Sequence, residues 1–127
     1  MKRKAPPKTP SSLGLEVEAA LAEHYARLGK SIKYRVAFRT PRGTPFAAER
    51  VTKGEINMWV PEQDQVRLQA EAAGLSIERS IPWPDGRSGN YGRLSSLKSV
   101  PGLFEETLLM IKVSSASQAL KVAEALV

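Results

Sequence analysis

From Ile32 to Arg39 the apolar residues Ile32, Tyr34, Val36 and Phe38 alternate with Lys33, Arg35, Ala37 and Arg39, and this period of two constrains the fold more than any other feature of the chain. Successive side chains of a β-strand point to opposite faces of a sheet, so the pattern predicts a half-buried strand. The next residues, 40–44 (TPRGT), are typical of a turn. Residues 45–51 can return beside the first strand, which predicts an antiparallel hairpin.

The two faces of this first strand are expected to have different surroundings. An apolar face packs against helices, whereas charged side chains are rarely buried without partners. The residues expected to be buried together are Tyr34, Val36, Phe38, Leu21, Leu28 and Ile111. The residues expected to point to solvent from the other face are Lys33, Arg35 and Arg39.

The remaining elements follow from the spacing of apolar side chains and from turn residues. Apolar residues three and four apart predict helices, and Gly29 and Gly74 are placed to end the first two. Ser114 and Ser115 offer an N-cap to the third. The expected helices are 14–28, 61–73 and 116–126, and the expected further strands are 56–60, 75–81 and 108–113. The last strand is predicted to be interior, because only Lys112 interrupts its apolar residues.

The order of these elements predicts an α+β fold. We expect a two-layer sandwich, in which three helices cover one face of a mainly antiparallel sheet of about four or five strands. Residues 1–12 carry basic side chains and three prolines without an apolar period. We therefore expect a flexible basic N-terminal arm at 1–12, followed by a single α+β domain over 13–127.

The composition excludes several classes of site. Cysteine is absent, so the chain has no disulfide, no cysteine-ligated zinc and no thiol nucleophile. No apolar stretch approaches the ~18 residues of a membrane span. The basic N-terminus is followed by prolines where a signal peptide needs an apolar run. We expect a cytoplasmic protein with no membrane partner.

Basic residues are concentrated in one part of the chain. Eight of the 19 lysines and arginines lie between Arg27 and Lys53, where Glu49 is the only acid. The formal net charge is +6, and a clustered excess of this kind attracts polyanions, nucleic acid first. The pattern predicts a non-catalytic nucleic-acid-binding domain or accessory subunit that contacts the phosphate backbone of DNA or RNA.

The predicted contacts lie on the first strand and its hairpin, in the N-terminal arm and in the glycine-rich segment 82–93. They are Lys33, Arg35, Arg39, Arg42, Lys53, Arg87, Arg93, Lys2, Arg3 and Lys4. Two aromatic residues are candidates for stacking on a base. Trp59 is expected on the polar face of its strand, and Tyr91 lies in the glycine-rich segment. The alternative for the basic residues of the strand and the arm is an ordinary solvated surface, and the alternative for Trp59 is packing beneath a loop.

Two other functions remain open at this point. The basic face would serve an interaction or inhibitor module by docking on an acidic surface of a partner protein. In a Mg²⁺-dependent nuclease, carboxylates would hold the metal. The acids considered for that role are Glu16, Glu55, Glu78, Asp85, Glu105 and Glu106. No recognisable motif arranges them, and the only histidine, His24, has no partner at a catalytic spacing. We expect no catalytic residue, no metal ligand and no cofactor.

Overall fold

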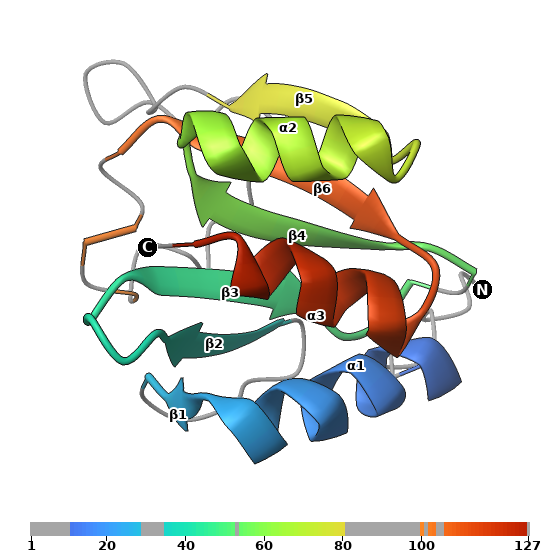
Figure 1. The fold of residues 1–127 in the computed structure, drawn as a ribbon. Helices are drawn as coiled ribbons and strands as arrows, with labels where there is room; N and C mark the ends of the chain where they lie inside the picture. Colours follow the sequence, from blue (N-terminus) through green and yellow to red (C-terminus); the bar gives the residue numbers. More distant parts are fainter. Residues whose placement is uncertain are drawn as a thin grey trace, which may run out of the picture.

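The computed structural model describes residues 11–28, 35–52, 54–80, 100, 102–103 and 106–126. Three helices and six strands lie within these ranges (Figure 1). The elements in chain order are α1 (Ser12–His24), β1 (Ala26–Arg27), β2 (Arg35–Arg39), β3 (Pro45–Glu49), β4 (Ile56–Pro61), α2 (Asp64–Ala72), β5 (Ile77–Ser80), β6 (Leu108–Val113) and α3 (Ala116–Glu124).

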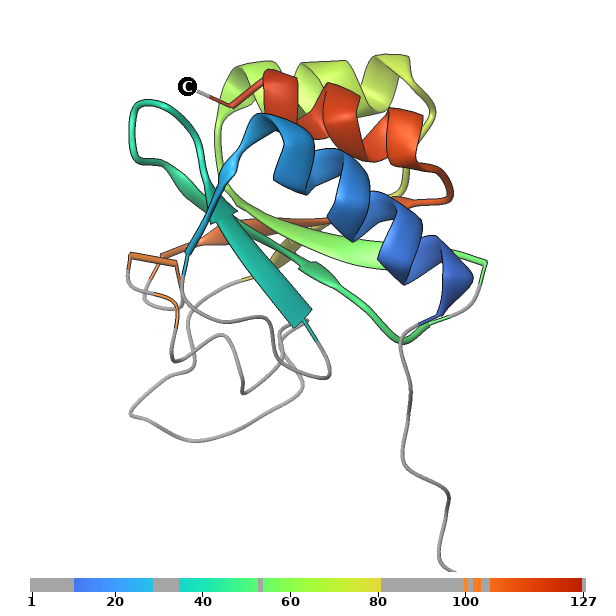
Figure 2. The ribbon, with the colours of Figure 1, turned by 90° about the horizontal axis from the view of Figure 1, so that it is seen from below.

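The strands form one antiparallel sheet in the order β1-β2-β3-β4-β6-β5. All three helices lie on the same side of this sheet, as the view from below shows (Figure 2). The predicted α+β fold with a helix-covered antiparallel sheet is therefore confirmed. The sheet has more strands than expected because Ala26 and Arg27 pair with Arg39 and Phe38 as a short edge strand.

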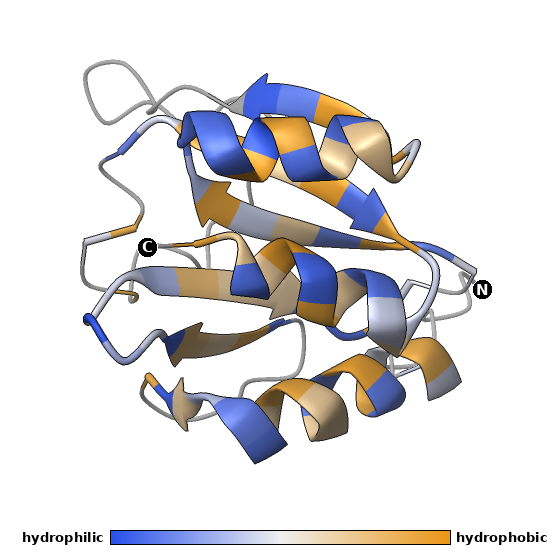
Figure 3. Ribbon diagram, in the orientation of Figure 1, coloured by the Kyte–Doolittle hydropathy of each residue, from blue (hydrophilic) through white to orange (hydrophobic). Residues whose placement is uncertain are grey.

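The helix-covered face of the sheet is apolar across almost its whole width. One cross-strand row consists of Val36, Ala48, Met58, Ile111 and Ile77, in neighbouring strands. The first four of these side chains are fully buried or nearly so. Figure 3 shows hydrophilic residues interrupting the hydrophobic ones along each helix, as expected for helices that cover a sheet with one side and meet solvent with the other.

The helix-free face also contains a small apolar core. Ala37, Ala47, Trp59 and Met110 form a cross-strand row on this side. Val100 and Leu103 pack against that row together with Leu108. The sheet is therefore covered on both sides at its centre, by helices on one side and by residues from the segment before β6 on the other.

Helix α1 begins and ends earlier than the sequence predicts. Its N-cap is Ser11, whose hydroxyl accepts a hydrogen bond from the Gly14 N–H at 2.9 Å. A Cβ at Gly14 would lie 2.2 Å from the carbonyl oxygen of Arg50, so only glycine allows this close approach. The helix ends at His24 because the chain turns into β1, and Leu28 donates its N–H to the Ala37 carbonyl oxygen instead of continuing a helix.

Leu28 consequently packs on a different core from the one expected. It lies half-buried against the apolar cluster of the helix-free face, whereas Leu21, Val36, Phe38 and Ile111 lie together in the helix-covered core. The predicted burial of these four residues is confirmed, and the predicted position of Leu28 is wrong. Tyr34, expected in the same group, lies outside the described residues.

The other two helices follow the sequence more closely. Gly74 follows α2 with a φ of 73°, and the Ser115 hydroxyl caps α3 by accepting from the Gln118 N–H. Pro61, however, is not the first residue of a helix. It is the last residue of β4, opposite Leu108, because the β4–β6 pairing continues as far as this position. In the described part of the chain, no helix has the length and apolarity required to cross a membrane.

Candidate nucleic-acid interface

Most of the predicted contact residues lie outside the described ranges. These residues are Lys2, Arg3, Lys4, Lys33, Lys53, Arg87, Tyr91 and Arg93. The structure therefore places four of the predicted residues, which are Arg35, Arg39, Arg42 and Trp59. Two of these four are buried and two are exposed.

Arg35 is buried, so the expectation that it points to solvent is wrong. It lies on the helix-free face as predicted, but only 3% of its surface is exposed. Burial lowers the pKa of its guanidinium, because removal from water disfavours the charged form. A side chain in this position is not available to a phosphate at the surface.

Trp59 is also buried, with 2% of its surface exposed. It lies on the helix-free face, on the side predicted from the sequence, but it packs into the apolar cluster with Ala47 and Leu103. The candidate role in stacking on a base is therefore wrong, and the alternative of a packed Trp59 is confirmed. Segments distant in the chain cover this part of the sheet, and a strand pattern alone does not reveal them.

Arg39 and Arg42 are exposed at the β2–β3 hairpin. The turn between the strands is closed by hydrogen bonds from the Thr40 N–H to the Thr44 carbonyl and from the Gly43 N–H to the Thr40 carbonyl. Gly43 has a φ of 90°, a conformation that glycine adopts without strain. Neither arginine forms an ion pair with a residue of the described ranges. Their charges are therefore available to a ligand.

Two acids in or near the basic stretch, Glu49 and Glu18, are already engaged. Glu49 is 7% exposed, and its carboxylate accepts hydrogen bonds from the Asn57 N–H and the Thr52 hydroxyl, both at 2.6 Å. Glu18 of α1 is also buried and forms ion pairs with Arg50 at 2.7 Å and Arg27 at 3.1 Å. Among the described residues of the hairpin, Arg39 and Arg42 are therefore the exposed cations.

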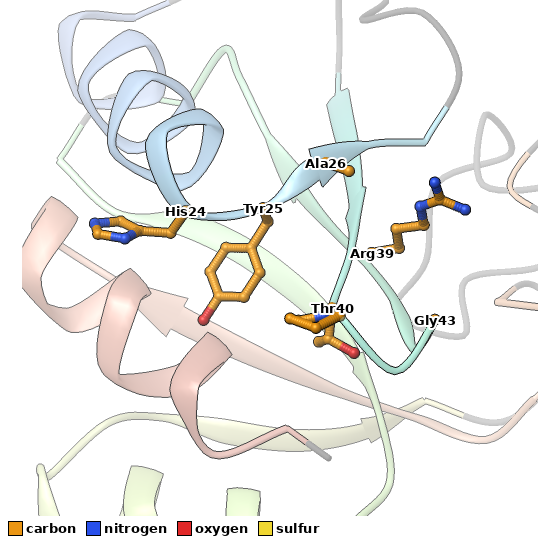
Figure 4. Close-up of a pocket in the computed structure, with 7 residues that line it drawn as sticks. His24, Tyr25, Ala26, Arg39, Thr40 and Gly43 are labelled. Atoms are coloured by element: carbon orange, nitrogen blue, oxygen red, sulfur yellow. The ribbon is translucent and has the colours of Figure 1, made fainter.

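A groove lies beside the hairpin, where β1, β2 and the end of α3 meet (Figure 4). Two hollows lie at this place, and His24, Tyr25, Thr40 and Pro41 line both of them. The Arg39 lobe has a volume of about 380 Å³ and adds Ala26, Arg39 and Gly43 to the shared residues. The Glu124 lobe has a volume of about 330 Å³ and adds Ala123, Glu124 and Leu126. We call the two lobes together the hairpin groove.

Tyr25 is the central aromatic residue of the hairpin groove. Its ring packs edge-on against Phe46, with ring centroids 5.2 Å apart. Figure 4 shows the ring between His24 and Thr40, with its hydroxyl directed towards the end of α3. Burial, and then the nearby carboxylate of Glu124, raise the pKa of this hydroxyl above its ordinary value. Tyr25 therefore keeps its proton at neutral pH.

The acids considered for a nuclease do not form a metal centre in the described part of the chain. No group of three or more His, Asp or Glu side chains in these ranges could hold a metal ion. Glu16, Glu55, Glu78 and Glu106 lie on the surface, while Asp85 and Glu105 are outside the described residues. His24 is exposed at the end of α1, beside the Tyr25 ring.

Neither a family model, nor a curated protein, nor a solved structure matches this chain. The function is therefore inferred from the geometry of the site. The exposure of Arg39 and Arg42 was predicted from the sequence, whereas the hairpin groove and its lining residues Tyr25 and Glu124 were not. No local signal was present, because the groove forms from the ends of α1 and α3, which lie far apart in the chain.

Proposed function

We propose that this protein binds nucleic acid at the β2–β3 hairpin, with Arg39 and Arg42 contacting phosphates. The observation that carries the proposal is the availability of these two charges. Both arginines are exposed and have no ion-pair partner in the described ranges. Arginine binds phosphate through two parallel N–H groups, which makes it well suited to this contact.

The charge around the hairpin supports the same proposal. Glu49, the only acid between Arg27 and Lys53, is buried and hydrogen-bonded, so it does not oppose the basic side chains at the surface. Of the described residues that line the Arg39 lobe, none is acidic. A phosphate approaching this lobe therefore meets Arg39 with no carboxylate among the described residues that line it.

The test is a binding titration with labelled single-stranded and double-stranded DNA and RNA at several salt concentrations. The wild type should bind with an affinity that falls steeply as salt rises, because phosphate binding releases counterions. The double variant Arg39→Gln/Arg42→Gln should bind more weakly. Its salt slope should be smaller by about one unit for each phosphate that the variant no longer binds.

A matched control removes the same charge from another part of the molecule. Arg67 and Arg79 both form ion pairs with Glu62, near α2 and the β5 edge of the sheet. The variant Arg67→Gln/Arg79→Gln should retain nearly all of the affinity. Equal losses in the two double variants would show that only net charge matters and would contradict binding at the hairpin. Absence of binding to all four nucleic acids would exclude the proposed function and favour docking on an acidic protein.

A further inference from the structure

The Glu124 lobe lies on the helix-covered side of the sheet and has an acidic lining. Tyr25, which lines it, packs against the helix-covered core, and Ala123 and Glu124 belong to α3 on the same side. Arg39 lies on the helix-free face, so its charge is separated from this lobe by the sheet. Of the described residues that line the Glu124 lobe, Glu124 is the only acid, and none is a lysine or an arginine.

The carboxyl-terminal ends of two helices meet at the same lobe. Helix α1 ends at His24 and α3 ends at Glu124, and both residues line it. Figure 1 shows these two ends on the same side of the molecule, beside the turn between β2 and β3. The carboxyl-terminal end of a helix carries a partial negative charge, which favours a cation and disfavours a carboxylate. The helix ends therefore add to the negative potential of Glu124.

Glu124 occupies an unfavourable position for an acid. It is the last residue of α3 and is exposed, and it forms no ion pair with a residue of the described ranges. Lys121, which lies one turn earlier in α3, does not form an ion pair with it either. Residues that conflict with the local rules of a helix are expected at functional sites. A cation bound in the lobe removes this conflict.

The other walls of the lobe suit an aliphatic stem that carries a positive charge at its end. The Tyr25 ring attracts cations to its face. The hydroxyl of Tyr25 keeps its proton at neutral pH, and its oxygen can accept a hydrogen bond. Pro41, Ala123 and Leu126 provide apolar surface. The volume of about 330 Å³ is at the lower end of the range for small-ligand sites, roughly 300–1,000 Å³.

We propose that the Glu124 lobe binds a primary ammonium group on an aliphatic stem, which is the chemistry of a lysine side chain or of a small free amine. The ammonium group donates hydrogen bonds to the Glu124 carboxylate and the Tyr25 hydroxyl oxygen, and the stem lies against Pro41 and Leu126. A single positive charge is favoured, because a chain with a net charge of +6 repels a polycation. This ligand is separate from the phosphate of the proposed function.

The test is a titration of the full-length protein, followed by the NMR signals of the methyl groups of Ala123 and Leu126. The cationic probes are N-acetyl-lysine N-methylamide and n-butylamine, and their neutral counterparts are N-acetyl-norleucine N-methylamide and n-butanol. The titrations are made at pH 8, where imidazole is neutral and does not repel a cation. Each cation should bind with a dissociation constant roughly fivefold lower than that of its neutral counterpart, the upper end for an exposed ion pair.

The two cationic probes also distinguish the sources of the ammonium group. Tighter binding of the lysine derivative than of n-butylamine would identify a lysine side chain as the ligand. Tighter binding of n-butylamine would identify a small free amine.

The variant Glu124→Gln should remove most of the preference for the cation, because it removes the negative charge. Glu124 is exposed, so the substitution should leave the fold intact, which thermal unfolding will verify. Glu71→Gln is the matched control, since Glu71 is an exposed acid in the last turn of α2 that does not line the lobe. It should keep the wild-type preference. Tyr25→Leu should weaken the binding of both cations roughly threefold, because the ring is lost.

Several results would overturn the ammonium site. Equal binding of the charged and neutral probes to the wild type would do so, and so would equal effects of Glu124→Gln and Glu71→Gln. Signal changes that are spread over the molecule and are not centred on the Glu124 lobe would also contradict it. None of these results affects the titration of Arg39 and Arg42 with nucleic acid, so the two proposals are tested separately.

Discussion

The two faces of the sheet are built in different ways, although the same strands form both. On the helix-covered face, apolar rows extend from β2 to β6, and three helices close over them. On the helix-free face, the apolar row at Ala37 and Trp59 lies next to a polar row. The members of the polar row are Arg35, Glu49, Asn57 and Lys112.

The polar row shows what burial requires of charged and polar side chains. Glu49 satisfies its carboxylate with two hydrogen bonds, whereas the Asn57 Oδ1 atom is buried without a hydrogen-bond partner in the described part of the chain. An unsatisfied buried acceptor costs about 1–3 kcal/mol. Apolar packing thus stabilises the whole helix-covered face. On the helix-free face, the buried polar row lowers the free energy of unfolding where an acceptor such as the Asn57 Oδ1 atom has no hydrogen bond.

The largest effect is expected on the helix-covered face. Phe38 is fully buried there and stacks on Phe46, with ring centroids 5.8 Å apart. Phe38→Ala should lower the free energy of unfolding by about 3–5 kcal/mol, measured by urea denaturation, because it leaves a cavity between sheet and helices. A decrease below about 1 kcal/mol in the free energy of unfolding would show that Phe38 is not tightly packed between the sheet and the helices.

A smaller effect should show whether the centre of the helix-free face is closed. Ala47 is fully buried on that face, next to Trp59. Ala47→Leu should destabilise the protein by about 1–3 kcal/mol, because the added atoms have no space. Ala26→Leu, at an exposed position of β1, is the control and should be nearly neutral. If Ala47→Leu changed the stability as little as Ala26→Leu does, the centre of the helix-free face would not be closed over Ala47.

Arg35 and Arg39 provide a comparison within one strand and one face. Arg35→Ala should cost about 1–2 kcal/mol, because its buried side chain is removed from the packing. Arg39→Ala should change stability by less than ~0.5 kcal/mol, because Arg39 is exposed. Thermal unfolding of the two variants in parallel provides the measurement. Equal effects would mean that the surroundings of the two arginines are the same.

The smallest effect concerns the pH dependence of stability. The pKa of Tyr25 is raised in the folded protein, so the unfolded chain loses this proton first as pH rises. The resulting stabilisation is complete below the unfolded pKa of about 10 and is lost as pH rises through the folded pKa. The unfolding temperature of Tyr25→Phe should therefore decrease less than that of the wild type above about pH 10. If the unfolding temperatures of the wild type and Tyr25→Phe fell in parallel with pH, the raised pKa of Tyr25 would be contradicted.

The sequence predicted the helix-covered face well because that face depends on local periodicity. Val36 and Phe38 are two residues apart in a strand that arginines flank, and the capping residue Ser115 and the terminating residue Gly74 lie next to the helices they define. The helix-free face was predicted less well. The burial of Arg35 and Trp59 depends on contacts with distant segments, such as the packing of Val100 and Leu103 on the row of Trp59. Periodicity within one strand carries no information about such contacts.

In the candidate site, too, some features follow from the local sequence and others require the tertiary fold. The exposure of Arg39 and Arg42 could be predicted from the sequence, because local geometry exposes hairpin residues. The hairpin groove was not found, because it requires Tyr25 from the end of α1 and Glu124 from the end of α3 to lie together. The tertiary fold brings these two ends together, and neither residue is exceptional in its own segment.

The position of β6 in the sheet has a consequence for how the protein is made. This strand pairs with β4 on one side and β5 on the other, although it follows both in the chain. While the ribosome is still synthesising the chain, β4 has an open edge until β6 has emerged. Open edges of nascent sheets invite pairing with other chains, and pairing between distant segments is slow. We therefore expect the interval before Val113 emerges to be the stage of synthesis at which this protein is most prone to aggregate.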